Sequence, residues 1–193
     1  MSKAAQPHDL LFGEVFSRKN AVAKFSAAFL PAKLVQKMKL PTLRPEPTSY
    51  VPPRLRRLYA DLVYSCLYGD DDIELCLIKE HKSTRPPDPH FQLLDYVVEK
   101  WRMDRKRKRK RTPVLCVLLY HGKEPWTYKP MSSYIKGIDS DLACYNPLFD
   151  FILVDLNNYS DEFILSLNEL FLVNALLLFK HSGDSSYIRQ HLD

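Results

Sequence analysis

The chain has 193 residues, of which 46% are hydrophobic and 26% charged, and this balance is ordinary for one soluble globular domain with a substantial core. The net charge of +5 is concentrated in one place, because residues 105–111 are seven consecutive lysines and arginines and the rest of the chain carries −2. Apart from this run, no low-complexity segment or internal repeat is evident, so the sequence predicts a single domain over residues 1–193.

The cysteines and the apolar runs indicate a reducing, non-membrane environment. Cys66, Cys76, Cys116 and Cys144 are widely spaced and form no CxxC pair, which is typical of buried thiols and does not favour a zinc site. No apolar segment follows Met1, and the longest apolar run, 163–179, is interrupted by polar residues. We therefore expect a cytoplasmic protein that makes no membrane contact.

Two short helices are expected at the start of the chain. Asp9 is a candidate N-cap for the first helix, whose apolar residues are Leu11, Phe12, Val15 and Phe16. A second helix carries apolar residues at 22, 25, 29 and 30 and ends at Pro31. The five prolines between positions 41 and 53 exclude a regular helix, so we expect an extended connection there.

The pattern of residues 60–82 predicts a β-hairpin, with apolar runs at 60–68 and 73–82 on either side of Gly69 and three aspartates. A two-residue turn at Asp70-Asp71 would place Asp61 opposite Glu80, with Lys82 on the same face. A three-residue turn would instead separate the two carboxylates, so the register stays open.

Two facing carboxylates repel each other unless a cation lies between them. Oxygen ligands suit Mg²⁺ or Mn²⁺, and Lys82 beside such an ion could steady a phosphate or help to deprotonate the attacking water. The implied chemistry is metal-assisted phosphodiester hydrolysis. The alternative is that the Glu-x-Lys triplet arises by chance and that these are solvated edge residues or cross-strand ion pairs.

A longer helix is expected after Asp88 and Pro89, with Phe91, Leu94, Val98 and Trp101 on its apolar face. The basic run follows it directly and should be a solvated loop or a frayed helix end. It could contact several DNA phosphates at once; the alternatives are an inert surface loop or, in a eukaryote, a nuclear import signal. The residues of this run are Arg105, Lys106, Arg107, Lys108, Arg109, Lys110 and Arg111.

The last third of the chain predicts two strands and a long helix. Residues 114–120 form a continuous apolar run typical of a central strand, and residues 149–156 form a further strand. Ser160 caps a helix that runs to Lys180 and His181. Residues 184–193 begin another helix, which suggests that a C-terminal part is missing. The order of elements predicts an α/β sandwich with a mixed central sheet in which the hairpin is central.

Four ordered blocks of this sequence resemble the Rpn family of bacteria, known as recombination-promoting nucleases or transposases. The blocks are residues 7–16, 59–61, 78–84 and 113–122, the last ending in Tyr120-His121-Gly122. Asp61 followed by Glu80-His81-Lys82 is also similar to the signature of the PD-(D/E)XK nuclease superfamily. The resemblance implies a three-layer α/β/α sandwich with a restriction-endonuclease-like core.

Carried over by position, the resemblance implies that Asp61 and Glu80 are metal ligands and that Lys82 is the catalytic lysine. The carbonyl of His81 would be a further ligand, and Glu14 would be the helical acid of the superfamily. Two positions depart from the family pattern, because Gly13 stands where a lysine is usual and Lys82 where glutamine is frequent. The role of Tyr120-His121-Gly122 is not assigned.

The leading hypothesis is therefore a Mg²⁺- or Mn²⁺-dependent DNA endonuclease associated with DNA recombination or mobile-element activity. The alternative is a catalytically inactive nucleic-acid-binding or toxin-like interaction module. A strand-transferring transposase would require a third acid late in the chain, for which the candidates are Asp150, Asp155, Asp161 and Glu162. DNA is the expected partner, and a homodimer stays open.

Overall fold

The computed structural model describes residues 7–46, 62–80, 87–184 and 187, with the backbone alone at 7–9, 72 and 74–80. Its helices and strands follow one another in the order α1 (Pro7–Phe16), α2 (Lys19–Phe29), α3 (Ala32–Val35), β1 (Met38–Pro45), β2 (Leu62–Tyr68), β3 (Asp71–Glu80), α5 (Pro89–Lys106), β4 (Val114–Tyr120), η2 (Met131–Tyr134), α6 (Ser140–Ala143), β5 (Ile152–Asp155), η3 (Leu156–Asn158), α7 (Asp161–Leu165) and α8 (Leu170–Lys180).

The five strands form one mixed sheet with the spatial order β1-β2-β3-β4-β5. The pairs β1/β2 and β2/β3 are antiparallel, whereas β3/β4 and β4/β5 are parallel. α5 connects β3 to β4 as the crossover that a parallel pair requires. The prediction of a mixed α/β fold with the hairpin at the centre of the sheet is confirmed, since β3 is the middle strand.

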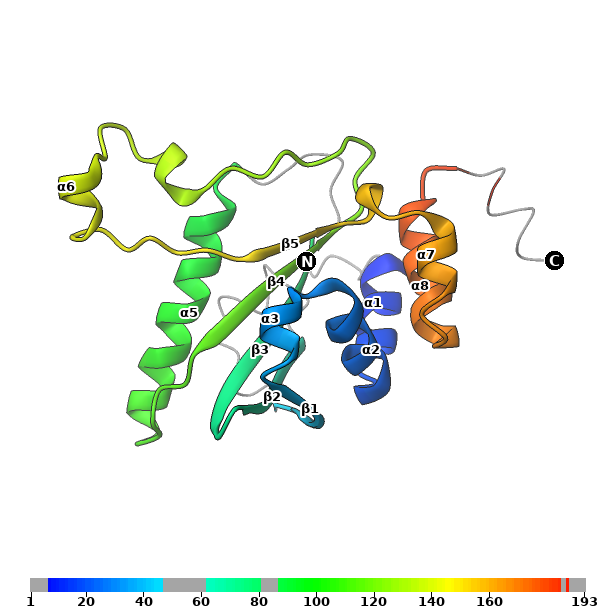
Figure 1. Cartoon of the computed structure of the whole chain (residues 1–193), viewed down its shortest axis with the longest axis horizontal. Coiled ribbons are helices and arrows are strands. Elements are labelled where there is room, and N and C mark those ends of the chain that lie inside the picture. The colour runs from blue at the N-terminus through cyan, green and yellow to red at the C-terminus, as the bar shows by residue number, and fades with distance from the viewer. Residues whose placement is uncertain (1–6, 47–61, 81–86, 185–186, 188–193) are drawn as a thin grey trace, which may run out of the picture.

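Helices cover both faces of the sheet, and two separate apolar clusters fill the interfaces. On one face α1, α2 and α8 pack against the sheet, and on the other face α5 does so (Figure 1). Successive residues of β4 alternate between the clusters: Val117 and Leu119 belong to the first, and Cys116 and Leu118 to the second. β4 is therefore a central strand buried on both faces, as its continuous apolar sequence predicts.

The hairpin turn lies one residue earlier than predicted. Tyr68 pairs with Asp71 and Leu62 with Leu77, so the two-residue turn is Gly69-Asp70, and Gly69 has φ = 62°. A positive φ at the first turn residue is the conformation that glycine adopts without a steric cost, which is why glycine fixes the turn position. The prediction of an Asp70-Asp71 turn is wrong: the observed register differs by two residues, so Leu62 faces Leu77 and not Lys79, and each described strand residue keeps its predicted face. The predicted pairing of Asp61 with Glu80 lies outside the described residues.

β1 is a strand that the sequence analysis did not predict. It contains Pro41 and Pro45, which cannot donate backbone hydrogen bonds, and it occupies the edge of the sheet. Its pairing with β2 is irregular between Lys39 and Arg44. The prolines do exclude a helix, but an edge strand tolerates them where a central strand would not.

The buried face of α5 is rotated by about one residue from the predicted face. Leu93, Tyr96 and Val97 are buried, whereas Phe91 is exposed. The same face continues into Lys100 and Asp104, which are 2% and 1% exposed and form an ion pair with 2.5 Å between Nζ and Oδ2. Helical spacing alone favoured the wrong apolar stripe because two charged residues occupy the true one.

Two helix boundaries also differ from the predictions. α1 begins at Pro7 and not at a cap on Asp9. The long helix predicted from Ser160 is two helices, although Ser160 does cap the first one by accepting a hydrogen bond from the Phe163 amide. The helical conformation is interrupted before Asn168, which has φ = 53°. The Glu169 side chain then caps α8 by accepting a hydrogen bond from the Leu172 amide. In the described part of the chain, no helix is long and apolar enough to cross a membrane.

Candidate active site

The ends of the parallel strands form a row of three residues at one edge of the sheet. Glu80, the last residue of β3, pairs with Tyr120 at the end of β4, and Tyr120 pairs with Asp155 at the end of β5. The carboxyl edge of parallel strands is the usual location of ligand-binding residues in α/β sheets. The row therefore defines the candidate site, which we call the carboxyl edge.

Tyr120-His121-Gly122 shapes the chain directly after β4. A Cβ atom at Gly122 would lie 2.1 Å from the Tyr120 hydroxyl oxygen, so only glycine allows the tyrosine ring to fold back over this turn. The Tyr120 hydroxyl donates to the Glu124 carbonyl at 2.9 Å. His121 is 6% exposed, and its Nδ1 donates to the Phe179 carbonyl of α8 at 3.1 Å. The motif thus fixes the end of β4 against α8.

Asp155 fixes the same turn from the other side. Its side chain is 1% exposed and accepts hydrogen bonds from the backbone amides of Trp126, at 2.6 Å, and Asn157, at 3.0 Å. The Asn157 side chain donates to the Gly122 carbonyl at 2.9 Å and to Asp155 at 2.8 Å. Because these contacts satisfy the buried carboxylate, Asp155 acts as a structural anchor for the carboxyl edge.

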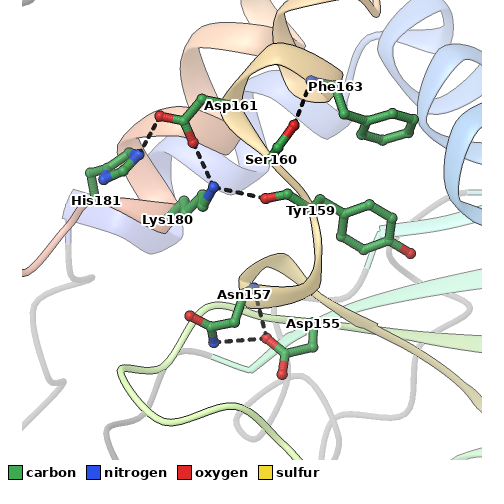
Figure 2. A network of polar contacts seen from close by, with 8 residues as sticks. All are labelled: Asp155, Asn157, Tyr159, Ser160, Asp161, Phe163, Lys180 and His181. Carbon is green, nitrogen blue, oxygen red and sulfur yellow. Dashed lines mark hydrogen bonds and ion pairs between the residues drawn. The ribbon is translucent and has the colours of Figure 1, made fainter.

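A polar network joins α7 to the end of α8 beside this edge (Figure 2). Lys180 Nζ lies 2.5 Å from Asp161 Oδ1 and donates to the Tyr159 carbonyl at 2.7 Å, while His181 Nε2 lies 2.8 Å from Asp161 Oδ2. Burial raises the pKa of Asp161, but the hydrogen bonds and charges of Lys180 and His181 outweigh it, so that the pKa lies below its usual value. Asp161 is therefore ionised at neutral pH and orients both partners.

A cleft of about 490 Å³ opens between these elements at the carboxyl edge. It is lined by the residues that follow β4, by Asn157, and by the end of α8 with the turn at 182–184. Its polar side chains include Lys123, Lys180 and His181. These residues were not predicted as site residues, because they converge from sequence positions about 60 residues apart.

The residues predicted for catalysis are described only in part. Asp61, His81 and Lys82 lie outside the described residues, and Glu80 is placed by its backbone alone. Among the residues that the structure describes, no group of three or more His, Cys, Asp or Glu side chains could hold a metal ion. The metal site formed by Asp61, Glu80 and the carbonyl of His81 stays a prediction.

Glu14 lies on an exposed surface of α1. Its carboxylate forms an ion pair with Arg18, with 2.8 Å between Oε1 and Nη2, and the Arg18 guanidinium stacks over the ring of Phe171 at 3.6 Å. Phe171 is at the beginning of α8, roughly 13 Å along the helix axis from Lys180, which lines the cleft. The structure thus brings Glu14 to Arg18, and its catalytic role stays a prediction.

The basic run begins in the last turn of α5 and continues in an ordered helix cap. The amide of Arg109 donates to the Asp104 carbonyl at 2.8 Å and that of Lys108 to the Arg105 carbonyl at 3.1 Å, which is the Schellman motif. Lys108 takes the left-handed conformation with φ = 55°. The Arg109 side chain folds back onto buried Asp104, at 3.1 Å. The prediction of a solvated loop or frayed helix end is therefore only partly right.

The basic run and the carboxyl edge lie at opposite ends of the sheet. The run precedes the first residue of β4, whereas Glu80 pairs with the last one. Seven residues of parallel strand separate these positions by about 20 Å. Figure 1 shows the same arrangement, with the end of α5 and the end of β4 at opposite corners.

The comparisons with known proteins identify the family. Residues 6–191 match the family described as "Putative transposase, YhgA-like". The chain belongs to this family. The matched region therefore contains both the described sheet and the segments that carry Asp61 and Glu80-His81-Lys82.

Curated relatives of the chain carry the names of recombination-promoting nucleases, which confirms the resemblance to the Rpn family. The chain is 27% identical over 188 residues to "Inactive recombination-promoting nuclease-like protein RpnE" of Escherichia coli K12, covering 97% of this chain and 62% of the relative. It is 26% identical over 161 residues to "Recombination-promoting nuclease RpnD" of Escherichia coli O157:H7, covering 81% and 61%. The chain spans about three fifths of the length of these relatives. No solved structure matches it significantly.

Proposed function

We propose that the chain is a metal-dependent DNA endonuclease whose site lies at the carboxyl edge. The observation that supports this most is the strand register. β3 ends at Glu80 beside the ends of β4 and β5, and the hairpin brings the start of β2, next in sequence to Asp61, to the same end of β3. We infer that Asp61 and Glu80, the acids of the family's nuclease signature, gather at this end of the central strand. A restriction-endonuclease-like core is part of this proposal.

The donor set suits a hard divalent cation. Two carboxylates, from Asp61 and Glu80, and a backbone carbonyl, from His81, are the oxygen ligands that Mg²⁺ and Mn²⁺ prefer, with water and phosphate oxygens completing the shell. Such an ion, when bound, lowers the pKa of a bound water and offsets the charge of the phosphoryl oxygens. We propose Mg²⁺ as the resident ion, with Mn²⁺ as a substitute.

The protein residues have distinct roles in this proposal. Lys82 places a positive charge next to the phosphate, where it stabilises the charge that develops on the phosphoryl oxygens. Asp61 and Glu80 orient the attacking water relative to the phosphorus. The Asp155 contacts and the Tyr120-Gly122 packing hold the edge in one shape. Hydrolysis then leaves products with a 3′-hydroxyl and a 5′-phosphate.

The basic run supplies the second part of the proposed function, which is sequence-independent affinity for DNA. All seven side chains of the run are at least partly exposed, and Arg105 and Lys106 occupy the last turn of α5. A duplex that crosses the roughly 20 Å between the run and the carboxyl edge would span about six base pairs. Contacts at the run would therefore hold the duplex while another segment lies at the site.

Relatives whose names contain the word "inactive" support the alternative hypothesis of an inactive nucleic-acid-binding module. The relative that aligns with 97% of this chain carries the word "inactive" in its name, whereas RpnD is named a nuclease without that word. The sequence of this chain retains the complete Asp61 and Glu80-x-Lys82 pattern. We therefore propose an active nuclease, and plasmid cleavage distinguishes it from an inactive module.

The test is cleavage of supercoiled plasmid by the purified chain with Mg²⁺ or Mn²⁺. We expect nicked and linear products, and a loss of at least about 100-fold in rate for Asp61→Asn, Glu80→Gln and Lys82→Met. Asp95→Asn, on the exposed face of α5, is the matched control and should cleave like the unchanged protein. DNA binding without any cleavage by the unchanged protein would instead show the inactive module.

A further inference from the structure

A second polar cavity lies at the end of the molecule opposite the carboxyl edge. It has a volume of about 220 Å³ and lies between the end of α5, strands β1, β2 and β3, and Thr112 just before β4. We call it the α5 pocket. Its charged lining residues are Arg44, Glu46, Lys100, Asp104, Arg109 and Lys110.

The charges of the α5 pocket favour an anion. Four cations and two carboxylates line it, so these described residues contribute a net charge of +2. Lys100 and Asp104 are almost completely buried, and Asp104 lies between two cations, Lys100 at 2.5 Å and Arg109 at 3.1 Å. A single carboxylate contacts two cations there, and the cations Arg44, Arg109 and Lys110 are exposed around this buried pair, so positive charge is in excess at the pocket.

A buried hydroxyl in the pocket points to a missing hydrogen-bond partner. Thr112 Oγ1 is inaccessible to solvent and forms no hydrogen bond with any described residue. The second hydroxyl of the pocket, that of Ser65, is already used, since it donates to Glu46 at 2.5 Å. Buried polar atoms are almost always hydrogen-bonded, and a bound ion is one of the standard reasons for an exception.

We propose that the α5 pocket binds a single phosphate group. The volume is several times that of one water molecule but below the roughly 300–1,000 Å³ of pockets that hold drug-sized ligands, which fits a small polyatomic anion and not a nucleoside. Lys110, which forms no ion pair among the described residues, and Arg109 are the cationic donors, and Thr112 donates its hydroxyl hydrogen. The site is about 20 Å from the carboxyl edge and does not depend on the proposed catalysis.

The first test is calorimetric titration of the purified chain with inorganic phosphate, with chloride at equal ionic strength as the reference. We expect saturable phosphate binding that weakens about tenfold in Lys110→Gln and severalfold in Thr112→Val, which keeps the shape of the side chain. Lys106→Gln is the matched control, since it removes the same charge from the same run outside the pocket, and should change the affinity less than about twofold.

Two results would overturn the proposal. One is the absence of phosphate binding beyond the chloride reference. The other is an equal loss in Lys106→Gln and Lys110→Gln, which would show that only the summed charge of the run matters. Both variants change exposed side chains, so circular dichroism should show an unchanged fold.

Oligonucleotides without divalent ions distinguish the source of the phosphate. A preference for a 5′-phosphorylated strand over its 5′-hydroxyl form, abolished by Lys110→Gln, identifies a strand end. An equal loss for both strands in Lys110→Gln that is several times larger than the loss in Lys106→Gln identifies a backbone phosphate. Binding of inorganic phosphate that neither strand displaces identifies a free phosphate ion. All three outcomes support the pocket, and none depends on plasmid cleavage, so failure here leaves the nuclease proposal intact.

Discussion

Asp161 connects two helices that the sequence predicts as one. Its carboxylate is 26% exposed and contacts both Lys180 and His181, which lie at the far end of α8. Since Asp161 is also in the first turn of α7, the contact brings the start of one helix to the end of the next. Asp161 thereby orients two of the polar side chains that line the cleft at the carboxyl edge (Figure 2).

Replacing Asp161 by asparagine should change how stability depends on pH. The pKa of Asp161 is lower in the folded protein than its ordinary value of 3.8, so its stabilisation is complete above that pH and is lost as the pH falls through the folded-state pKa. We expect Asp161→Asn to lower the free energy of unfolding by about 1 kcal/mol at pH 7. The difference should shrink below about pH 4.

The measurement is urea denaturation of both proteins between pH 3 and pH 7. Asp141→Asn, at an exposed position of α6, is the control and should follow the unchanged protein. A difference between Asp161→Asn and the unchanged protein that stays constant across this range would contradict the account.

At the end of α5 a lysine of the basic run occupies a backbone conformation that favours glycine. The Schellman cap requires a left-handed residue at position 108, where glycine is favoured and this chain has lysine. The cap is kept because Arg109, the next residue, pairs with buried Asp104. The cap at Lys108 and Arg109 thus ends the helix and turns the rest of the basic run away from the axis of α5.

Replacing Lys108 by glycine should therefore stabilise the helix end. The left-handed conformation costs a non-glycine residue about 1–2 kcal/mol, and glycine loses about 0.5–1 kcal/mol of that gain through the entropy of the unfolded chain. We expect Lys108→Gly to be about 1 kcal/mol more stable than Lys110→Gly, which removes the same charge at an ordinary φ. Thermal denaturation in phosphate-free buffer measures this, and equal stabilities would contradict the assigned conformation.

The elements that the sequence predicted well are those with strong local signals. β4 is recognisable from its apolar run, and Ser160 from its capping pattern. The predictions were wrong where tertiary contacts determine which residues are buried or where a helix ends. Lys100 and Asp104 occupy the buried face of α5, so apolar spacing selected the wrong stripe. Asn168 breaks the predicted last helix although it gives only a weak signal as a helix breaker.

At the scale of the whole molecule, the basic run proposed to bind DNA and the proposed catalytic site lie at opposite ends of the sheet. α5 runs between them along one face, from Pro89 to the basic run (Figure 1). A substrate that contacts both ends must extend about 20 Å along the protein. Binding and cleavage should therefore respond to different substitutions.

Neutralising Arg105, Lys106 and Arg111 to glutamine together tests this separation. All three are exposed and none lines the α5 pocket. If each contacts one phosphate, the slope of log affinity against log salt concentration should fall by about 3. The single-turnover cleavage rate at saturating DNA should stay within about twofold of the unchanged protein. Fluorescence anisotropy at several salt concentrations measures the slope, and an unchanged slope would exclude the run from the DNA contact.

The candidate site could be predicted from the sequence only in part. The acids near the hairpin follow from the family signature, and the structure places the backbone of Glu80 at the end of β3. That Asp61 and Glu80 meet at this edge stays a prediction. The lining of the cleft could not be predicted, because Asn157 and Lys180 reach Gly122 only through the folded chain. The role of Tyr120 and Gly122 likewise depends on a close contact between a ring and a backbone, which no spacing rule shows.

The most direct test of the central claim is a crystal structure of the chain soaked with Mn²⁺, with data collected at the manganese absorption edge. The account predicts one anomalous peak at the end of β3, bound by the carboxylates of Asp61 and Glu80, with the Lys82 ammonium close by. A structure in which these carboxylates lie on different sides of the sheet, with no peak at this edge, would contradict it.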